Sequence, residues 1–228
     1  MTQIVRIEWA RLAGQRPRAA GCNARLGEHG RSVSVPLARV TTDEGAVGFG
    51  WAQLLRDQAA AWVGRELDQA WTLSSGVRAP FVALEYPLWD LAGQMAGKPV
   101  YRLIGDESVA DAGLCVACYD TSLYMDDLHL ADDDAAAELV ACEALEGAAR
   151  GHRAFKIKVG RGAMHMPMAE GTRRDIRVIR AVREAMGADA LIMIDANNGY
   201  NLNLARQVLE ETADAGVYWI EEAFHEDG

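Results

Sequence analysis

The pattern of apolar and polar positions divides the chain into two regions with different predicted structures. In the first fifty residues apolar and polar positions alternate, which predicts an antiparallel meander with strands over 4–13, 33–42 and 46–52. Asp43-Glu44-Gly45 predicts the turn between the last two strands. The stretch 13–31 is rich in Gly and Arg, too long for a tight turn and too polar for a core, so we predict a mobile loop there.

The pattern then changes to helical spacing and afterwards to a strand and helix alternation. Apolar residues from Ala79 to Met95 predict a helix that ends before Gly97-Lys98-Pro99. After about Gly113, short apolar runs alternate with amphipathic segments, which is typical of βαβ units and a parallel sheet. The expected strands are 114–119, 153–159, 190–195 and 217–221, and the expected helices are 132–150, 169–186 and 201–216. We therefore predict an α+β domain over 1–110 and an α/β domain over 111–228.

Composition and charge restrict the kinds of partner. With 228 residues and 50% hydrophobic content, the chain is long enough to form a globular core. Its net charge of −10 argues against binding to nucleic acid or an anionic membrane, because both need basic patches. No leader pattern follows Met1 and no apolar run reaches the ~18 residues of a membrane span, so a cytoplasmic, small-molecule role is expected.

The four cysteines do not have the pattern of a disulfide framework. They are few and scattered for a chain of this length, at Cys22, Cys115, Cys118 and Cys142, so reduced thiols are expected. Cys115 and Cys118 lie three residues apart in an apolar run interpreted as a strand. Side chains at that spacing point to opposite faces of a strand, which favours packing over a shared metal or a bridge.

Lysine is rare in this chain, and two lysines lie in one predicted strand. The chain has 3 lysines against 20 arginines, and Lys156 and Lys158 are separated by one residue. In the run FKIKV both lysines face one way and the apolar side chains the other. Mutual repulsion and partial burial would lower a lysine pKa, so one lysine is a candidate general base and the other a candidate anion holder for a carboxylate substrate. The alternative is a solvated lysine face on an edge strand.

Two acids end the next two predicted strands. Asp195 closes the run LIMID, and Glu221 closes VYWIE one βα unit later. The carboxyl ends of neighbouring parallel strands form the site in α/β folds, so these acids and both lysines should converge. Clustered carboxylates favour Mg²⁺ over Zn²⁺, although an acid before a helix is alternatively an N-cap. The sequence therefore predicts a magnesium site at this edge of the sheet.

These motifs resemble the enolase superfamily, in its mandelate racemase and muconate lactonizing branch. The resemblance lies in KIK, IDAN and WIEE on successive predicted strands and in the stretch ACYDTS before them. VPLARVTTDEGAVGFGWA and YPLWDLAGQMAGKPVYRLIG are similar to the family's capping domain. The resemblance covers almost all of the chain and implies an α+β capping domain followed by about four of the eight strands of a TIM-like (β/α) barrel.

The resemblance also implies an activity and roles for individual residues. Lys158 would remove the proton alpha to a carboxylate, Lys156 would help to neutralise that carboxylate, and Asn197 would hold a substrate hydroxyl. Asp195 and Glu221 would bind Mg²⁺, which takes up charge on the enediolate. A sugar-acid dehydratase or racemase is the expected enzyme class. The alternatives are a muconate-type cycloisomerase or epimerase, and a non-catalytic remnant that binds an acid or a partner subunit.

The chain departs from the family pattern in two places. Ala223 stands where the family usually has Pro after the paired glutamates. The family's third carboxylate ligand and its opposite acid or base would lie after Gly228, so we expect a partial sequence whose 228 residues alone have weak metal affinity and little turnover. Members of the family are commonly assemblies, which is compatible with a homo-oligomer.

Overall fold

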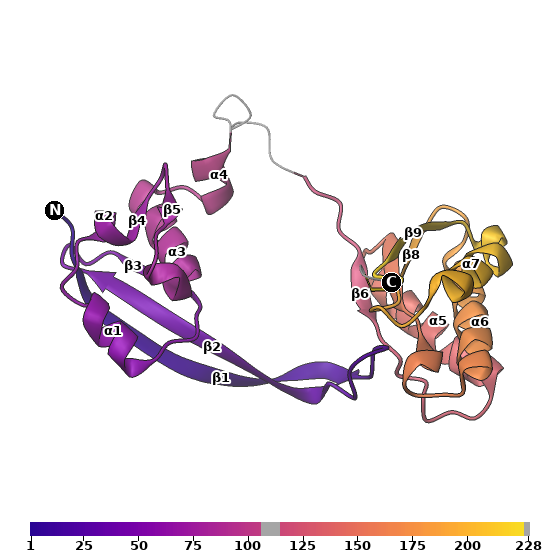
Figure 1. The fold of residues 1–228 in the computed structure, drawn as a ribbon. Coiled ribbons are helices and arrows are strands. Elements are labelled where there is room, and N and C mark those ends of the chain that lie inside the picture. The colour runs from indigo at the N-terminus through magenta and orange to yellow at the C-terminus, as the bar shows by residue number, and fades with distance from the viewer. Residues whose placement is uncertain (106–114, 226–228) are drawn as a thin grey trace. The chain divides into compact units, whose positions relative to one another are not determined.

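The computed structural model describes residues 1–105 and 115–225, which form two compact units (Figure 1). The first unit comprises Met1–Gln15 and Val33–Cys115, and the second comprises Arg16–Ser32 and Val116–Gly228. The outer part of the first hairpin therefore groups with the second unit. No helix among the described residues combines the length and the apolar character needed to cross a membrane.

Three strands form the first sheet, in the order β1-β2-β3. They are β1 (Ile4–Ala20), β2 (Gly30–Thr42) and β3 (Val47–Trp51), and β2 and β3 pair antiparallel with Leu37 opposite Trp51. This confirms the predicted strands and the turn at Gly45, which has a φ of 81°. The predicted loop over 13–31 was wrong, because β1 continues to Ala20 and β2 begins at Gly30.

The hairpin extends because backbone pairing does not require burial. The outer part of β1, AGQRPRAA, has no large apolar side chain, so it carries no apolar alternation from which a strand can be predicted. Arg16 supports the ribbon across its width, donating to the carbonyl oxygens of His29 at 3.3 Å, Gly30 at 3.1 Å and Ser32 at 2.9 Å.

Short helices and one longer helix pack on the first sheet. They are α1 (Arg56–Trp62), α2 (Leu67–Ala70), a 3-10 turn (Phe81–Leu84), α3 (Glu85–Ala96) and α4 (Val100–Ile104), with a small hairpin of β4 (Trp71–Thr72) and β5 (Gly76–Val77). The predicted end of α3 is confirmed, since Gly97 adopts the left-handed conformation after it. Gly48 on β3 allows α3 to approach, because a Cβ there would lie 2.3 Å from the Pro87 carbonyl oxygen.

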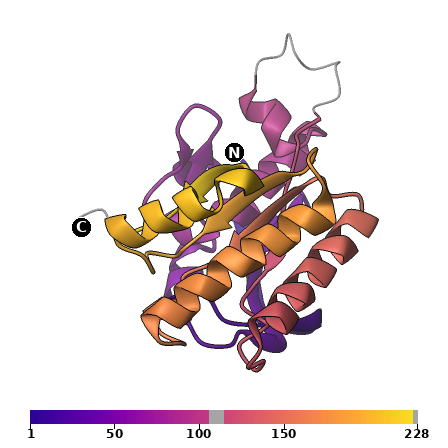
Figure 2. The same cartoon turned by 90° about the vertical axis from the view of Figure 1, so that its right-hand side faces the viewer.

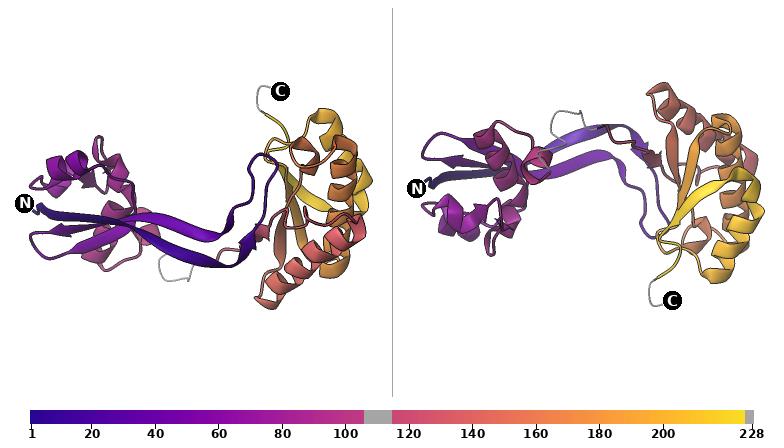
Figure 3. Two further views of the ribbon diagram at one scale, coloured as in Figure 1. Left: turned by 90° about the horizontal axis from the view of Figure 1, so that it is seen from below. Right: turned by 90° about the horizontal axis from the view of Figure 1, so that it is seen from above.

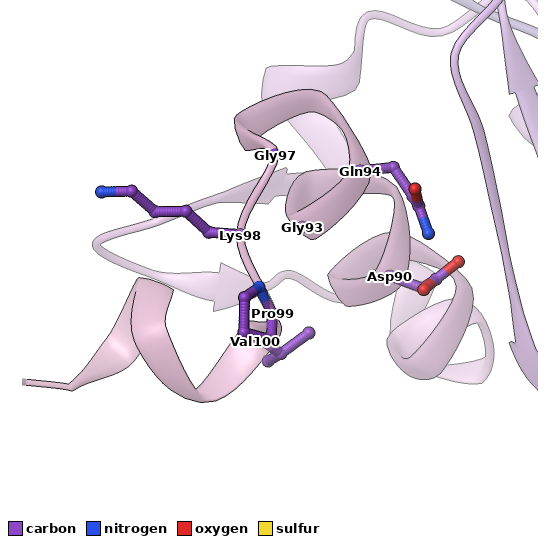
Figure 4. Close-up of a pocket in the computed structure, with 7 residues that line it drawn as sticks. All are labelled: Asp90, Gly93, Gln94, Gly97, Lys98, Pro99 and Val100. Atoms are coloured by element: carbon purple, nitrogen blue, oxygen red, sulfur yellow. The ribbon is translucent and has the colours of Figure 1, made fainter. Parts of the chain in front are cut away.

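A pocket of about 370 Å³ lies where α3 gives way to α4 (Figure 4). Figure 4 shows the Lys98 side chain extended away from Asp90 and Gln94. Asp90 accepts a hydrogen bond from the Phe49 amide at 2.9 Å, which ties α3 to the edge strand β3. The polar groups around this pocket therefore do not converge on one ligand.

The second unit is a four-stranded parallel sheet in the order β6-β7-β8-β9. Its strands are β6 (Asp120–Leu123), β7 (Ala154–Lys158), β8 (Leu191–Asp195) and β9 (Val217–Glu221). Helices α5 (Asp133–Ala149), α6 (Met168–Met186) and α7 (Leu202–Glu211) connect them, and Figures 2 and 3 show these helices side by side on one face of the sheet. The strand and helix alternation predicted from the sequence is confirmed for three of the four strands and for all three helices.

The strand predicted at 114–119 was wrong. The structure places β6 at Asp120–Leu123, while Leu114 lies outside the described residues. Leu123 is fully buried in the core of the unit whereas Val116 is 72% exposed, so the apolar run precedes the strand instead of forming it. All four cysteines are free, as predicted, but Cys115 and Cys118 are exposed and not packed.

Arg18 joins the outer hairpin to α5 and the loop after β6. Its guanidinium donates to the Ser122 carbonyl oxygen at 2.8 Å and lies 3.4 Å from Glu143 and 3.8 Å from Asp126. Arg18, Asp126 and Glu143 border a cavity of about 540 Å³. Burial, followed by a hydrogen bond to Asp126 and the charge of that carboxylate, raises the pKa of Glu143 from 4.5 to about 8.

This pKa shift predicts that stability falls as pH rises. Because the folded state favours protonated Glu143, its contribution is complete below pH 4.5 and is lost as pH rises through about 8. We expect the free energy of unfolding to decrease over that interval, and Glu143→Gln to flatten the dependence. Urea denaturation at a series of pH values measures this. Glu138→Gln, at an exposed position of the same helix, is the control. If the free energy of unfolding changed with pH equally in both variants, the prediction would be contradicted.

Candidate functional site

The two lysines of β7 are buried on the face of the sheet opposite the helices. Phe155 and Ile157 pack into the core beneath the helices, and the alternation of the strand directs Lys156 and Lys158 to the other face. Each lysine is only 7% exposed. The alternative of a solvated lysine face is therefore wrong, and both ammonium groups need partners, since burying an unpaired charge is costly.

Strand register brings the predicted acids to these lysines. Lys158 is the register partner of Asp195, and Asp195 is in turn the partner of Glu221 on β9. The Lys158 Nζ donates to Asp195 Oδ2 at 2.6 Å. The Lys156 Nζ donates to Glu221 Oε1 at 2.8 Å and lies 3.2 Å from Asp195 Oδ2. The convergence of all four side chains at the carboxyl ends of the strands is as the sequence predicted.

Asn197 lies within the same cluster, in a strained turn after β8. Its amide oxygen accepts from Lys158 Nζ at 3.0 Å, and its amide nitrogen donates to Glu222 Oε2 at 3.0 Å. Among the described residues, the non-glycine positions with positive φ are Asn197, Asn198 and Glu222, at 43°, 60° and 43°. Such backbone costs ~1–3 kcal/mol per residue and tends to occur where function needs a fixed geometry.

The charges of the cluster shift the pKa values of two of its members. Burial alone would raise the pKa of Asp195, but the hydrogen bond and charge of Lys158 hold that pKa below its usual value. Burial alone would lower the pKa of Lys156, but Glu221 and Asp195 raise it. For Lys156 the facing carboxylates therefore outweigh the effect of burial, which agrees with the expectation that one lysine of the pair stays charged. Lys156 remains a charged group able to hold an anion.

Two tyrosines that flank β6 also face the lysines. The Lys156 Nζ lies 5.3 Å from the centre of the Tyr119 ring, and the Lys158 Nζ lies 5.5 Å from the centre of the Tyr124 ring. A cation over an aromatic face at this range is attracted to the ring. Sequence reasoning missed both tyrosines: Tyr119 was the last residue of the predicted strand 114–119 but was given no role, and Tyr124 was placed in the loop after that strand.

The tip of the outer hairpin lies against the loops that carry the cluster. Ala24 contacts Gly160 and Gly199, where an added Cβ would lie 2.8 Å and 2.7 Å from the Ala24 Cβ. The Arg25 guanidinium donates to the carbonyl oxygens of Asn197 and Asn198. These contacts join segments more than 130 residues apart, and no local signal in the sequence announces them.

The donor set fits a magnesium ion better than a zinc ion. Asp195 and Glu221 supply two carboxylates from adjacent strands, and Mg²⁺ binds through one or two carboxylates together with water and substrate oxygens. In the described part of the chain no three His, Cys, Asp or Glu side chains gather in a way that would enclose a metal. An all-protein zinc cage is therefore not present among these residues, whereas an open magnesium site is compatible with them.

Comparisons of the sequence with known proteins identify relatives of one kind. Residues 139–228 match the family described as enolase C-terminal domain-like. D-Galactarolactone cycloisomerase of Agrobacterium fabrum is 29% identical over 208 residues, covering 82% of this chain and 50% of that protein.

Comparison of the structures identifies a more similar enzyme. A mutant of galacturonate dehydratase from Geobacillus sp., complexed with Mg, superposes with a TM-score of 0.93 at 48% identity, covering 99% of this chain and 59% of that chain. The same enzyme complexed with D-galacturonate and 5-keto-4-deoxy-D-galacturonate superposes with a TM-score of 0.91 at 48% identity and the same coverage.

The family of these relatives is the one that the motifs KIK, IDAN and WIEE indicated, and these motifs lie on the parallel sheet of the second unit. The chain spans about half the length of the curated relatives that it matches and 59% of the galacturonate dehydratase chain. By sequence and by fold, this chain belongs to the enolase superfamily, in its mandelate racemase and muconate lactonizing enzyme branch.

Proposed function

We propose that this chain carries the base and two metal ligands of a Mg²⁺-dependent sugar-acid dehydratase. The observation that carries the proposal is the Lys158 ammonium, buried 2.6 Å from Asp195 and beside the Asp195–Glu221 pair. The carboxyl ends of these strands therefore bring together a lysine that can remove a proton and two acids that can hold a metal ion. The metal ion would neutralise the carboxylate of the substrate acid next to the carbon that loses the proton.

We propose a uronic acid as the substrate class. The Geobacillus enzyme is seen with D-galacturonate and its 5-keto-4-deoxy derivative, and its identity to this chain is 48%. Conversion of one compound into the other removes the proton at C5, which is alpha to the C6 carboxylate, and the hydroxyl group at C4. The sum of the two is one molecule of water, so no oxidant or reductant is required.

In the proposed reaction the lysines have separate tasks. Lys158 in its neutral form accepts the C5 proton on Nζ, and the electrons of the C5–H bond form the enediolate. Lys156 stays charged, as its raised pKa favours, and holds the carboxylate by charge. Asn197, fixed between Lys158 and Glu222, orients a substrate hydroxyl. The C4 hydroxyl then leaves with one proton as water, which balances the proton taken from C5. The resulting C4–C5 enol becomes the 5-keto product by losing the proton on the C5 oxygen and gaining one at C4.

Asp195 and Glu221 would hold the magnesium ion. The bound ion supplies positive charge that stabilises the negative charge developing on the carboxylate oxygens. The burial of Asp195, at 1% exposure, excludes water from the inner side of the pair, which strengthens any charge interaction there.

We further propose that the four parallel strands belong to a (β/α) barrel, preceded by a capping domain over 1–110, with the barrel part over 111–228. The parallel strand order and the helices on one face support a barrel, since closing such a sheet buries the lysine face inside. The length of the relatives also supports it, because this chain covers about half of them.

A cycloisomerase is the second candidate, favoured by the similarity to D-galactarolactone cycloisomerase. It would use the same lysine and acids without loss of water. A racemase or epimerase would return the proton to the other face, and a non-catalytic remnant would bind acids without exchanging any proton.

Proton exchange at the carbon alpha to the carboxylate tests the proposal. The full gene product that contains this chain is incubated in D₂O with a panel of uronic and aldonic acids, with Mg²⁺ or with EDTA, and followed by proton NMR. We expect Mg²⁺-dependent loss of the α-proton signal and formation of a keto-deoxy acid from a uronate. Exchange without dehydration would favour a racemase. A new product formed without loss of water would favour a cycloisomerase. Absence of exchange with every acid, in protein shown to bind Mg²⁺, would refute the proposal.

Removal of one carboxylate should weaken metal binding. Asp195→Asn is expected to lower Mg²⁺ affinity at least ~10-fold, because even groups that only support a ligand contribute that much. Titration calorimetry, or competition with Mn²⁺ followed by EPR, measures the affinity. Asp189→Asn, an exposed change near the other end of the same strand, is the control. Equal affinities of the two variants would exclude Asp195 as a ligand.

A further inference from the structure

A fully buried arginine lies directly behind the lysines. Arg161 is 0% exposed and binds two aspartates that are also fully buried. Its Nε and Nη2 donate to the two carboxylate oxygens of Asp127, at 3.0 Å and 2.5 Å, and its Nη1 donates to Asp175 Oδ1 at 2.7 Å. Nη1 also reaches the carbonyl oxygen of Lys158 at 3.2 Å, so the arginine contacts the backbone of the proposed base.

Asp175 extends this contact to a second loop of the site. Its Oδ2 accepts from the Gly160 amide at 2.8 Å and from the Tyr200 hydroxyl at 2.7 Å. Tyr200 ends the turn that begins at Asn197, and its own amide donates to the Ala223 carbonyl oxygen at 3.1 Å. One carboxylate on α6 therefore joins the segments that follow β7, β8 and β9.

We propose that Arg161, Asp175 and Tyr200 are positioning residues that hold Lys158 and Asn197 in register with each other. The positional part of this inference stands on the contacts above, and its consequence for turnover rests on the proposed function. None of the three side chains has a hydrogen bond to Lys158 Nζ or to the Asn197 amide among the described contacts. They act through the backbone that carries those groups.

Two observations argue that packing alone does not explain this network. A buried ion pair contributes little net stability compared with apolar residues of the same volume, so a core has no need of it. The turn that it joins after β8 also has left-handed backbone at two non-glycine residues, with φ of 43° at Asn197 and 60° at Asn198, which persists only where surrounding contacts impose it. The carboxylate and the hydroxyl group supply those contacts.

The scarcity of lysine provides a direct readout of position. The chain has 3 lysines, so selective labelling with ¹³C at Cε gives one signal each for Lys98, Lys156 and Lys158. The Lys158 signal is sensitive to its place over the Tyr124 ring, whose centre is 5.5 Å from Nζ. Lys98 lies in the other unit and serves as an internal reference.

The test compares two variants that each remove one buried hydroxyl group. Tyr200→Phe removes the donor to Asp175, and Thr212→Val removes a donor to the Val208 carbonyl oxygen, also at 2.7 Å, at the end of α7. Both variants should lose a similar, modest amount of stability, since each loses one buried hydrogen bond. We expect Tyr200→Phe to move the Lys158 signal and Thr212→Val to leave it in place. In a parallel assay of α-proton exchange, kcat should fall roughly 10-fold to 100-fold in Tyr200→Phe with little change in KM.

Asp175→Asn gives a second, independent variant, because it keeps the acceptor for Gly160 and Tyr200 but removes the charge facing Arg161. A Lys158 signal that is unmoved in Tyr200→Phe and in Asp175→Asn, or that moves equally in Thr212→Val, overturns the inference. A Lys158 signal that moves only in the network variants supports it, even where no acid is turned over. A Lys158 signal that moves only in the network variants, in a protein that turns over no acid, would refute the proposed function and leave the positioning role intact.

Discussion

Replacement of Lys158 by Ala is expected to lower Mg²⁺-dependent α-proton exchange by about 10²-fold to 10⁴-fold, the usual contribution of a positioned general base. The geometry supports a large effect because Lys158 Nζ lies 2.6 Å from one proposed metal ligand and is only 7% exposed as a residue. Among the described residues, the other lysine of the cluster, Lys156, is itself engaged with Glu221 at 2.8 Å and is poorly placed to replace it.

Two further variants separate loss of the base from loss of charge. Lys158→Arg keeps a positive charge but cannot give up its proton near neutral pH, so it should be as inactive as the alanine variant. Lys98→Ala removes the lysine of the other unit and should retain full exchange. Exchange measured by loss of the α-proton signal in D₂O decides the matter. Substantial exchange in Lys158→Arg would exclude Lys158 as the base, whatever the alanine variant does.

The site was largely predictable because simple rules of strand geometry determine it. Alternation along β7 puts Lys156 and Lys158 on one face, and parallel order puts Asp195 and Glu221 at neighbouring strand ends. Neither inference needs a contact between distant segments. The same rules failed for the predicted strand 114–119, whose described residues 115–119 are exposed in the structure, and the correct strand DTSL has few apolar residues.

Contacts made by polar residues over long sequence distances were not predictable. Arg25 binds the loop after β8 from a hairpin whose own strands show no apolar alternation. Arg161 gave no signal at all, since nothing in RGA distinguishes a fully buried arginine from one on the surface of an arginine-rich chain. The role of each of these arginines depends on the groups that it contacts, and those contacts exist only in the folded chain.

The division of the proposed site into residues that react and residues that hold them has a physical basis. Lys158, Asp195 and Glu221 need to exchange protons or bind an ion, so they lie at the open ends of the strands. Arg161 and Asp175 are sealed from solvent, where their charges interact strongly and reorient little. A sealed network behind the cluster therefore keeps the strained turns fixed.

Replacement of Arg161 by Met is expected to be the most destabilising single change in the second unit, at about 3–5 kcal/mol, because it leaves buried charge without a partner. Asp127 and Asp175 are both 0% exposed and both lose the hydrogen bonds of Arg161 at once, which leaves Asp127 with the more distant Arg174 at 3.7 Å. Arg177→Met on α6 is the matched control: its 2.6 Å ion pair with Asp134 is exposed, so its loss should cost no more than ~1 kcal/mol.

Urea denaturation of both variants at neutral pH measures this difference, and similar midpoints would contradict the assignment of Arg161 as a buried charge centre. A third variant identifies the cause of the loss. If uncompensated charge is responsible, adding Asp127→Asn to Arg161→Met should recover part of the lost stability, since it removes one of the unpaired carboxylates. If the loss came only from a cavity, the added change would destabilise the protein further. A positive coupling between the two substitutions therefore distinguishes an electrostatic origin from a packing one.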